Sequence, residues 1–253
     1  MRRMAGFAEA LKGISPEQWT TMARALGAGL AMGLGAVGTA VGMGLAGGRA
    51  CEGIARQPDA KEAITRIMLL GQATSETSSI FALLVAILLI VTGPAGHGLT
   101  AALGAIGAGL SIGLGAMYTG LGSGFPNASA CSGVARNPDN HGPLIRTMLV
   151  GQAVAQGSAI FALLVSFILI YSVTDADPLR AFAFLSAGLC MGAGAMGPGV
   201  GMGMAAAGGC EGVSINPSAQ AAVMRVMLLG QAVAQSTAVY ALIIAICLIY
   251  VVR

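Results

Sequence analysis

The chain has 253 residues, of which 13 are Lys or Arg and 10 are Asp or Glu. Charged residues therefore make up 9%, against about 25% in soluble globular domains, which excludes an ordinary water-soluble protein. Hydrophobic residues make up 56% and glycine occupies 39 positions, a composition suited to helices that pack closely in lipid. The net charge of +3 is not gathered into basic runs, so nucleic-acid binding is not expected.

Residues 1–23 form an N-terminal extension that precedes the first apolar stretch. They carry several charges but no apolar core, so they do not match a cleaved signal peptide. A short helix that lies at the membrane interface, anchored by Trp19, is the alternative for this segment.

Long uncharged stretches predict an all-α membrane protein with six transmembrane helices. The stretches that exceed the roughly 20 residues needed to cross a bilayer are 25–48, 147–174, 181–210 and 226–252. Between Arg66 and Arg136 the single charged residue is Glu76. Two more helices fit there, separated by a turn at 92–96.

A repeat organises these helices into three tandem copies. The sequence Met-Leu-Leu-Gly-Gln-Ala at 68–73 recurs almost unchanged at 148–153 and 227–232. Each copy begins with a Gly/Ala-rich helix, passes through a polar loop and returns in a Leu/Ile-rich helix. We therefore predict three helical hairpins, at 24–92, 98–173 and 179–252.

The two helices of each copy differ in bulk, which predicts two layers. The glycines of the first helix allow close approach of neighbouring backbones, so we expect an inner layer of first helices and a lipid-facing layer of second helices, as in a tight ring of hairpins. Each polar loop contains a proline that stops one helix and starts the next: Pro58, Pro138 and Pro217. Lys and Arg are almost equally divided between the two ends of the hairpins, so the positive-inside rule does not settle the orientation.

Glu76 is the candidate functional residue of the chain. It lies ten residues after Arg66, about 15 Å into a hydrocarbon core about 30 Å thick. An ionisable side chain at that depth is costly and is typical of a proton or ion relay. We expect it to be neutralised when it faces lipid, either by a proton or by a bound cation.

Candidate ion ligands lie on the same helix as Glu76. Gln72 is four residues earlier on the same face, Thr77 offers a hydroxyl, and Thr74 offers a carbonyl freed by hydroxyl competition. The alternative is a structural Glu76 held by Gln72 and Thr77, although a neutral Gln fills that role at lower cost.

The repeat supplies its own comparison for Glu76. The second and third copies carry Gln156 and Gln235 at the equivalent positions. Two hairpins therefore keep the hydrogen-bonding shape and lose the titratable charge.

Together these features resemble the c-subunit proteolipids of rotary ATPases, those of the F-type in particular. The resemblance covers about residues 24–252 and rests on the Gly-rich helices, the loop Arg56-Gln57-Pro58 and the sequence Gly-Gln-Ala-Thr-Ser-Glu-Thr at 71–77. It implies a multi-pass protein of the inner membrane in which hairpins form a homo-oligomeric ring, with polar loops on the cytoplasmic side. It also implies a non-catalytic, ion-translocating subunit of an ATP synthase or ATPase that has no cofactor and whose transported ion is H⁺ or Na⁺.

The same resemblance implies roles for individual residues and partners. Glu76 would carry the ion past a stator a-subunit. Arg56, Gln57 and Pro58 would contact the central-stalk subunits.

The fusion of three hairpins departs from the family pattern of one hairpin with one carboxylate. A ring of such chains has three hairpins for each ion site, so fewer ions cross per ATP. Because moving each charge costs about 2.3 kcal/mol per 100 mV, the same ATP energy then supports a steeper gradient. The two-hairpin, one-carboxylate proteolipids of vacuolar-type pumps follow the same logic, and we predict ATP-driven pumping rather than synthesis.

The identity of the ion stays open between H⁺ and Na⁺. The resemblance implies that a sodium site needs a Gln on the inner helix, where this chain has Met43, Ser123 and Met202. Thr77 matches the hydroxyl of sodium sites and Ser123 offers another oxygen. These positions favour protons and keep a sodium site at Glu76 as the alternative.

Two other functions are compatible with six helices and one membrane carboxylate. A stand-alone proton-coupled transporter generally needs a cavity lined by aromatic or polar groups. The Gly-rich helices offer mostly Gly, Ala and Met instead. In a purely structural proteolipid Glu76 would have no function.

Overall fold

The computed structural model describes residues 15–94, 96, 98–172 and 178–252. Of the described residues 94% are helical, and no strand occurs among them. Six helical stretches in those ranges are long and apolar enough to cross a membrane. The prediction of an all-α protein with six transmembrane helices is confirmed. Residues 1–14, most of the expected N-terminal extension, lie outside the described part of the chain.

Seven α-helices build the described fold. Their bounds are α2 Pro16–Arg56, α3 Lys61–Val91, α4 Leu99–Arg136, α5 His141–Ala155, α6 Gly157–Tyr171, α7 Pro178–Ile215 and α8 Gln220–Tyr250. Ser15 caps α2, because its side chain accepts from the Gln18 backbone N–H at 3.3 Å and its own N–H donates to the Gln18 side chain at 2.8 Å. Residues 16–23 are therefore part of the first long helix, which begins before the boundary expected at residue 24.

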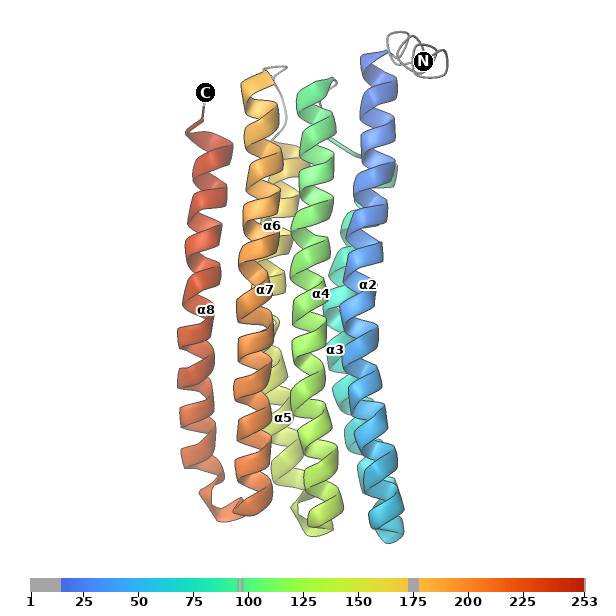
Figure 1. Ribbon diagram of the computed structural model, residues 1–253, viewed down its shortest axis with the longest axis vertical. Helices are drawn as coiled ribbons and strands as arrows, with labels where there is room; N and C mark the ends of the chain where they lie inside the picture. The colour runs from blue at the N-terminus through green and yellow to red at the C-terminus, as the bar shows by residue number, and fades with distance from the viewer. Residues whose placement is uncertain (1–14, 95, 97, 173–177, 253) are drawn as a thin grey trace, which may run out of the picture.

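The helices form two layers, with the first helix of every hairpin in one layer. Helices α2, α4 and α7 lie side by side in chain order, and α4 packs against both of the others (Figure 1). In the second layer α3 packs against α2 and α4, while α5 and α6 pack against α4 and α7. Helix α8 closes the series by packing against α7. The arrangement is an open arc of three hairpins.

Glycine, which has no side chain, explains why the inner helices lie so close together. A Cβ atom at Gly109 of α4 would overlap the backbone of Gly27 in α2. One at Gly188 of α7 would likewise overlap the backbone of Gly107 in α4. The two inner contacts repeat each other, and both depend on glycine at the crossing, as in small-residue packing of membrane helices.

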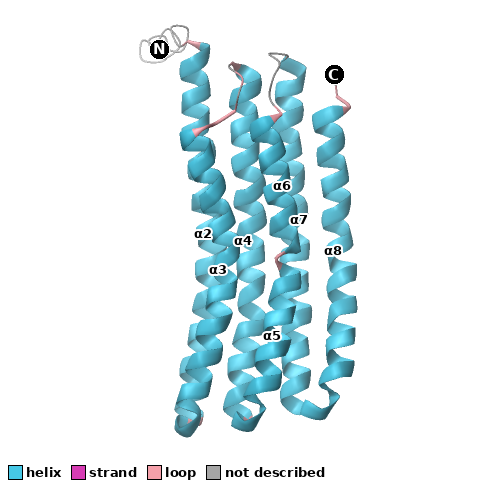
Figure 2. Ribbon diagram, turned by 180° about the vertical axis from the view of Figure 1, so that it is seen from behind, coloured by secondary structure: helices cyan, strands magenta, loops and turns pink. Residues whose placement is uncertain are grey.

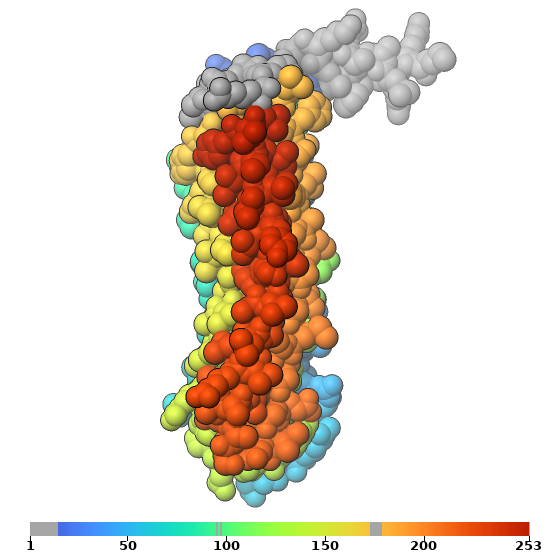
Figure 3. Space-filling model, turned by 90° about the vertical axis from the view of Figure 1, so that its left-hand side faces the viewer, coloured from blue at the N-terminus to red at the C-terminus, as the bar shows by residue number. Residues whose placement is uncertain are grey.

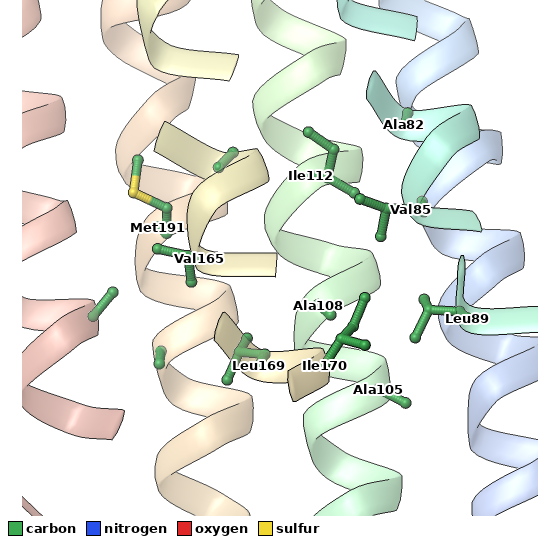
Figure 4. Packing of buried hydrophobic residues seen from close by; sticks show 14 of the residues in the cluster. Ala82, Val85, Leu89, Ala105, Ala108, Ile112, Val165, Leu169, Ile170 and Met191 are labelled. Atoms are coloured by element: carbon green, nitrogen blue, oxygen red, sulfur yellow. The ribbon is translucent and has the colours of Figure 1, made fainter. Parts of the chain in front are cut away.

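Branched side chains fill the space between the layers. Ile112 of α4 lies beside Val85 of α3 (Figure 4), and Leu89 of α3 and Val165 and Leu169 of α6 belong to the same fully buried cluster. In the most apolar 18-residue stretch of each helix, 72% of the residues of α4 are buried but only 17% of those of α8. Helix α8 runs along the middle of the face shown in Figure 3, between α7 on one side and α5 and α6 on the other. The central hairpin is thus enclosed by its own chain, and α8 lies at an edge.

Short 3-10 turns join the two helices of each hairpin at the same end of the molecule. They are Pro58–Ala60, Pro138–Asn140 and Pro217–Ala219. Each begins with the proline that the repeat predicts as a helix stop and start. In the second turn the Asn140 amide donates to the Val213 carbonyl at 2.7 Å, which links hairpin 2 to hairpin 3.

A candidate ion site at the open edge

Glu76 lies in the middle of α3 and is exposed. The Ser79 hydroxyl donates to its backbone carbonyl at 2.8 Å. Within the part of the chain that the structure describes, no side chain donates to the Glu76 carboxylate. The carboxylate is therefore available to a group from outside the chain.

Gln156, the counterpart of Glu76 in the second copy, is 6% exposed. Its Nε2 donates to the Thr74 carbonyl at 3.3 Å and to the Ser123 Oγ at 3.2 Å. It thus joins the outer helix of hairpin 1 to the inner helix of its own hairpin. We call this contact region, formed by Thr74, Ser123 and Gln156, the first internal seam.

The outer helix of hairpin 2 is interrupted at this residue. Helix α5 ends at Ala155 and α6 begins at Gly157, with the break visible in Figure 2. The Gln156 backbone N–H still donates to the Gln152 carbonyl at 3.1 Å. Helices α3 and α8 run unbroken through the equivalent level.

Gln235, the counterpart in the third copy, repeats the direction of Gln156. A Cβ atom at Gly157 would lie 3.0 Å from the Gln235 Nε2, so the Gln235 side chain lies against the outer helix of hairpin 2. We call this region, formed by Gly157 and Gln235, the second internal seam. In both internal seams the glutamine reaches the preceding hairpin, and Glu76 has no preceding hairpin in its own chain.

A second series of glutamines ties each outer helix to its inner helix. These residues donate through Nε2 to an inner-helix carbonyl at one repeat position: Gln72 to Met43 at 3.1 Å, Gln152 to Ser123 at 2.8 Å and Gln231 to Met202 at 3.1 Å. Gln152 also donates to the Gly71 carbonyl at 3.0 Å, and Gln231 to the Gly151 carbonyl at 2.8 Å. Gln72 therefore holds hairpin 1 together.

The structure groups Thr74 and Ser123 with Gln156. The Thr74 carbonyl accepts from Gln156, and the single proton of its hydroxyl has two acceptors within reach, the Gln152 Oε1 and the Gly71 carbonyl at 3.0 Å. Thr77, next to Glu76 in sequence, is half-buried. Sharing a helix with Glu76 does not place these oxygens around its carboxylate.

Two residues beside the first internal seam were not predicted from the sequence. Gln152 is buried and could have been recognised, because all three copies keep this glutamine. Asn127 donates to the Met68 carbonyl at 3.1 Å, and a Cβ atom at Gly71 would overlap its side chain. No repeat signal marks Asn127, because the other copies carry glycine and alanine there.

The predicted stalk-contact residues lie at the loop end of hairpin 1. Arg56 ends α2, Gln57 follows it, and Pro58 opens the 3-10 turn. Arg56 and Pro58 are exposed and Gln57 is half-buried. The Arg56 guanidinium lies 3.5 Å from the Glu52 carboxylate on the helix surface, a weak pair at this exposure.

The fold and its mid-helix carboxylate define a membrane proteolipid built from repeated helical hairpins. A family model described as the ATP synthase c-subunit matches three times, at residues 26–89, 106–169 and 185–248. The chain belongs to the ATP synthase c-subunit family, whose members are non-catalytic membrane subunits of that complex, so it is a subunit rather than an enzyme by itself.

Single relatives align with about one repeat of the chain. The ATP synthase c-subunit of Mesomycoplasma hyopneumoniae is 54% identical over 68 residues, 27% of this chain and 66% of that protein, slightly under two thirds of its length. The ATP synthase c-subunit of Alkaliphilus oremlandii is 42% identical over 84 residues, 33% of this chain and 94% of the relative. The chloroplastic c-subunit of Euglena gracilis is 47% identical over 72 residues, 28% of this chain and 89% of the relative.

Proposed function

We propose that the chain is a rotor subunit of a rotary ATP synthase or ATPase, in which Glu76 carries one ion for every three hairpins. One observation carries the proposal. Of the three equivalent side chains, the two glutamines lie in internal seams, whereas the one carboxylate is exposed at the open edge of the arc. A buried, neutral amide has no ion to exchange, while a mid-membrane carboxylate has.

The ring is proposed to form from copies of this chain joined head to tail. Cβ atoms at Gly29 and Gly33 of α2 would meet nothing within 4 Å. At the equivalent positions Gly109 and Gly113 of α4, they would meet the α2 backbone. The face of α2 that is open in one chain is thus the face that the inner helices bury elsewhere, which supports a neighbouring copy as its partner.

This head-to-tail order places the partners of Glu76 on a neighbouring chain. Gln156 reaches the Thr74 carbonyl on the preceding outer helix, and the repeat equivalents of Thr74 and Thr77 at the end of the chain are Val233 and Ser236. The proposed ion site consists of Glu76 from one copy with the Val233 carbonyl and the Ser236 hydroxyl from the next. Gln72 supports it by fixing α3 to α2.

The ion is proposed to be H⁺. The inner-helix residue at the repeat position of Ser123 is Met43 in hairpin 1, and its thioether is a poor ligand for Na⁺. Ser123, the one hydroxyl at this repeat position, bonds to Gln156 in the first internal seam. A single carboxyl with few other oxygens suits a proton better than a metal ion.

The direction of work is proposed to be ATP-driven pumping. One ion site per three hairpins lowers the number of ions that cross per ATP, and each ion can then be driven against a larger potential. The loops with Arg56, Gln57 and Pro58 are proposed to face the cytoplasm and the central stalk, with the a-subunit beside the outer helices. Efficient ATP synthesis at an ordinary ion-motive force would contradict this direction.

Carbodiimide labelling of the purified ring tests the function, because a neutral buried carboxyl reacts and an ionised or ion-occupied one does not. We expect one label per chain at Glu76, lost at high pH and unaffected by sodium. Protection by sodium would identify a sodium rotor instead. Absence of label in an assembled ring would return Glu76 to a structural role, and ion transport by the chain alone in liposomes would support a stand-alone transporter.

A further inference from the structure

We propose that the three inner helices form a binding site for the headgroup of an anionic phospholipid at the loop end of the chain. The site is a hollow of about 690 Å³, and all the residues that line it belong to α2, α4 and α7. A volume of several hundred Å³ is typical of small-molecule sites. The proposal depends on contacts within one chain, so it goes beyond the proposed function and does not rest on it.

The hollow exists because the middle helix carries small side chains there. Ala128, Ser129 and Ser132 of α4 line it. At the repeat positions of the two serines, helix α2 carries the longer residues Arg49 and Glu52. Small residues on α4 beside longer ones on α2 leave a depression in the inner layer. The other two copies carry serine and glycine at the position of Arg49, so this combination occurs once in each chain.

The deep end of the hollow is apolar. It is lined by Leu45, Phe125 and Met204, one from each inner helix at the same repeat position. Phe125 precedes Arg136, at the end of α4, by eleven residues, or about 16 Å along the helix axis. The side chains of Leu45 and Met204 are 42% and 62% exposed, so this end of the hollow is open to a hydrocarbon chain.

The loop end of the hollow is cationic. It is lined by Arg49, Arg56 and Arg136, whose side chains are all more than half exposed. The guanidiniums of Arg49 and Arg56 lie 2.9 and 3.5 Å from one carboxylate, that of Glu52. Arg136 lies 3.8 Å from Glu211. Two carboxylates among three guanidiniums leave one net positive charge, and because each guanidinium has five N–H donors, donors remain available to an anion.

Two hydroxyls add neutral donors beside the guanidiniums. Ser129 and Ser132 are half-buried and line the hollow. On the same helix the buried Ser123 hydroxyl donates to the carbonyl one turn earlier at 3.0 Å. Among the residues that the structure describes, neither Ser129 nor Ser132 has such a side-chain partner. Their hydroxyls are therefore available to donate to a ligand in the hollow.

Guanidiniums and hydroxyls together suit a phosphate group, which accepts several charge-assisted hydrogen bonds at once. The apolar deep end favours a phosphate that carries hydrocarbon chains over a soluble one. Basic pockets between membrane helices bind lipid headgroups by the same combination. A lipid that only fills the hollow would show no preference for headgroup charge. A specific site instead predicts such a preference, dependence on the arginines, and one bound lipid per chain.

Lipid binding to the purified, delipidated full-length protein, counted by native mass spectrometry, tests the proposal. Phosphatidylglycerol is the anionic probe and phosphatidylcholine the zwitterionic control. We expect one tightly held phosphatidylglycerol per chain, with an affinity about tenfold or more above that of phosphatidylcholine, because charge-assisted hydrogen bonds differ between them. Equal affinities for the two lipids would overturn the proposal.

Two variants locate the site. Arg49→Gln/Arg136→Gln removes two guanidiniums and should lower the affinity for phosphatidylglycerol about tenfold. Arg146→Gln, an exposed arginine on the outer helix α5, is the matched control and should leave the affinity unchanged. No loss in the double variant, or an equal loss in the control, would overturn the proposal.

A serine variant tests the hydroxyls without changing any charge. Ser129→Ala/Ser132→Ala should lower the affinity for phosphatidylglycerol by a smaller factor, about threefold, because neutral hydrogen bonds are weaker than charged ones. This variant also keeps the proposal testable if the arginine variant does not fold. An unchanged affinity in the serine variant would contradict the assignment of these hydroxyls to the site.

Inorganic phosphate distinguishes the two sources of the anion. It should displace phosphatidylglycerol poorly, because it gains nothing from the apolar deep end. Displacement at an equal concentration would overturn the lipid assignment and identify a site for soluble phosphate. None of these measurements involves labelling of Glu76, so a failure of this proposal leaves the proposed function intact.

Discussion

The first internal seam and the open edge place nearly the same side chain in opposite surroundings. Gln156 is buried and bonds to two helices, whereas Glu76 is exposed and receives no side-chain donor from the described residues of its own chain. The comparison shows that a chain of fused hairpins has two kinds of contact between hairpins, those inside the chain and those at its open edges. Seams inside the chain contain neutral amides, and the carboxylate proposed to exchange the ion lies at the edge where another copy is proposed to begin.

The largest expected effect comes from removing the one carboxylate. Glu76→Gln should abolish carbodiimide labelling and ATP-driven ion transport while the ring still assembles, because the side chains have the same shape. Gln235→Leu is the matched control and should leave both activities close to those of the natural chain. Retention of ion transport by Glu76→Gln would contradict the role of the carboxylate.

A pair of glycine substitutions should separate folding from assembly. Gly109→Leu places a side chain on the backbone of Gly27 and should destabilise the folded chain by about 3 kcal/mol or more. Gly29→Leu meets open space and should leave the monomer folded while preventing ring formation. Circular dichroism in detergent reports the first effect and native mass spectrometry the second. An intact ring in Gly29→Leu would refute head-to-tail closure through α2.

The glutamines that join inner and outer helices should differ in their contribution to stability. Gln152 is fully buried and donates to carbonyls on two helices, so Gln152→Leu should cost about 2 kcal/mol in unfolding free energy. Gln72 makes one such bond, and Gln72→Leu should cost about 0.6 kcal/mol, the average for hydrogen bonds between membrane helices. Denaturation by detergent mixtures measures both, and equal losses of unfolding free energy would contradict the expected difference between Gln152 and Gln72.

The smallest expected effect distinguishes two neighbouring hydroxyls. If the Ser236 hydroxyl of another copy accepts a hydrogen bond from the neutral Glu76 carboxyl, Ser236→Ala should slow the carbodiimide labelling of Glu76 slightly, because it removes support for the reactive neutral form. Thr77→Ala should leave the labelling rate unchanged, because Gly157, its equivalent in the second copy, faces the following hairpin. Slower labelling caused by Thr77→Ala alone would assign the hydroxyl to the same chain instead.

Much of the fold could be predicted because the repeat multiplies each local signal by three. The loop prolines at 58, 138 and 217 mark the turns, and the difference between Gly-rich and Leu-rich helices predicts the two layers. The break of the outer helix at Gln156 could not be predicted, because it arises in the one copy whose mid-membrane residue is enclosed on both sides.

The site was less accessible to sequence reasoning. A lone charge in an apolar stretch identifies Glu76, but spacing along one helix predicts only which residues share its face. Thr74 is two residues from Glu76 and yet its carbonyl accepts from Gln156, 82 residues away. Asn127 lies beside Gly71 because α4 of hairpin 2 packs against α3 of hairpin 1, and no local sequence pattern predicts that contact.

Disulfide cross-linking tests most directly the claim that Glu76 lies at a seam between chains. The five natural cysteines are first replaced by alanine, and the pair Thr77→Cys/Gln156→Cys serves as the control that closes within one chain. The account predicts that Glu76→Cys/Ser236→Cys, oxidised in the membrane, gives a ladder of covalent oligomers up to the closed ring. Monomeric product from that pair, with the control fully closed, would contradict it.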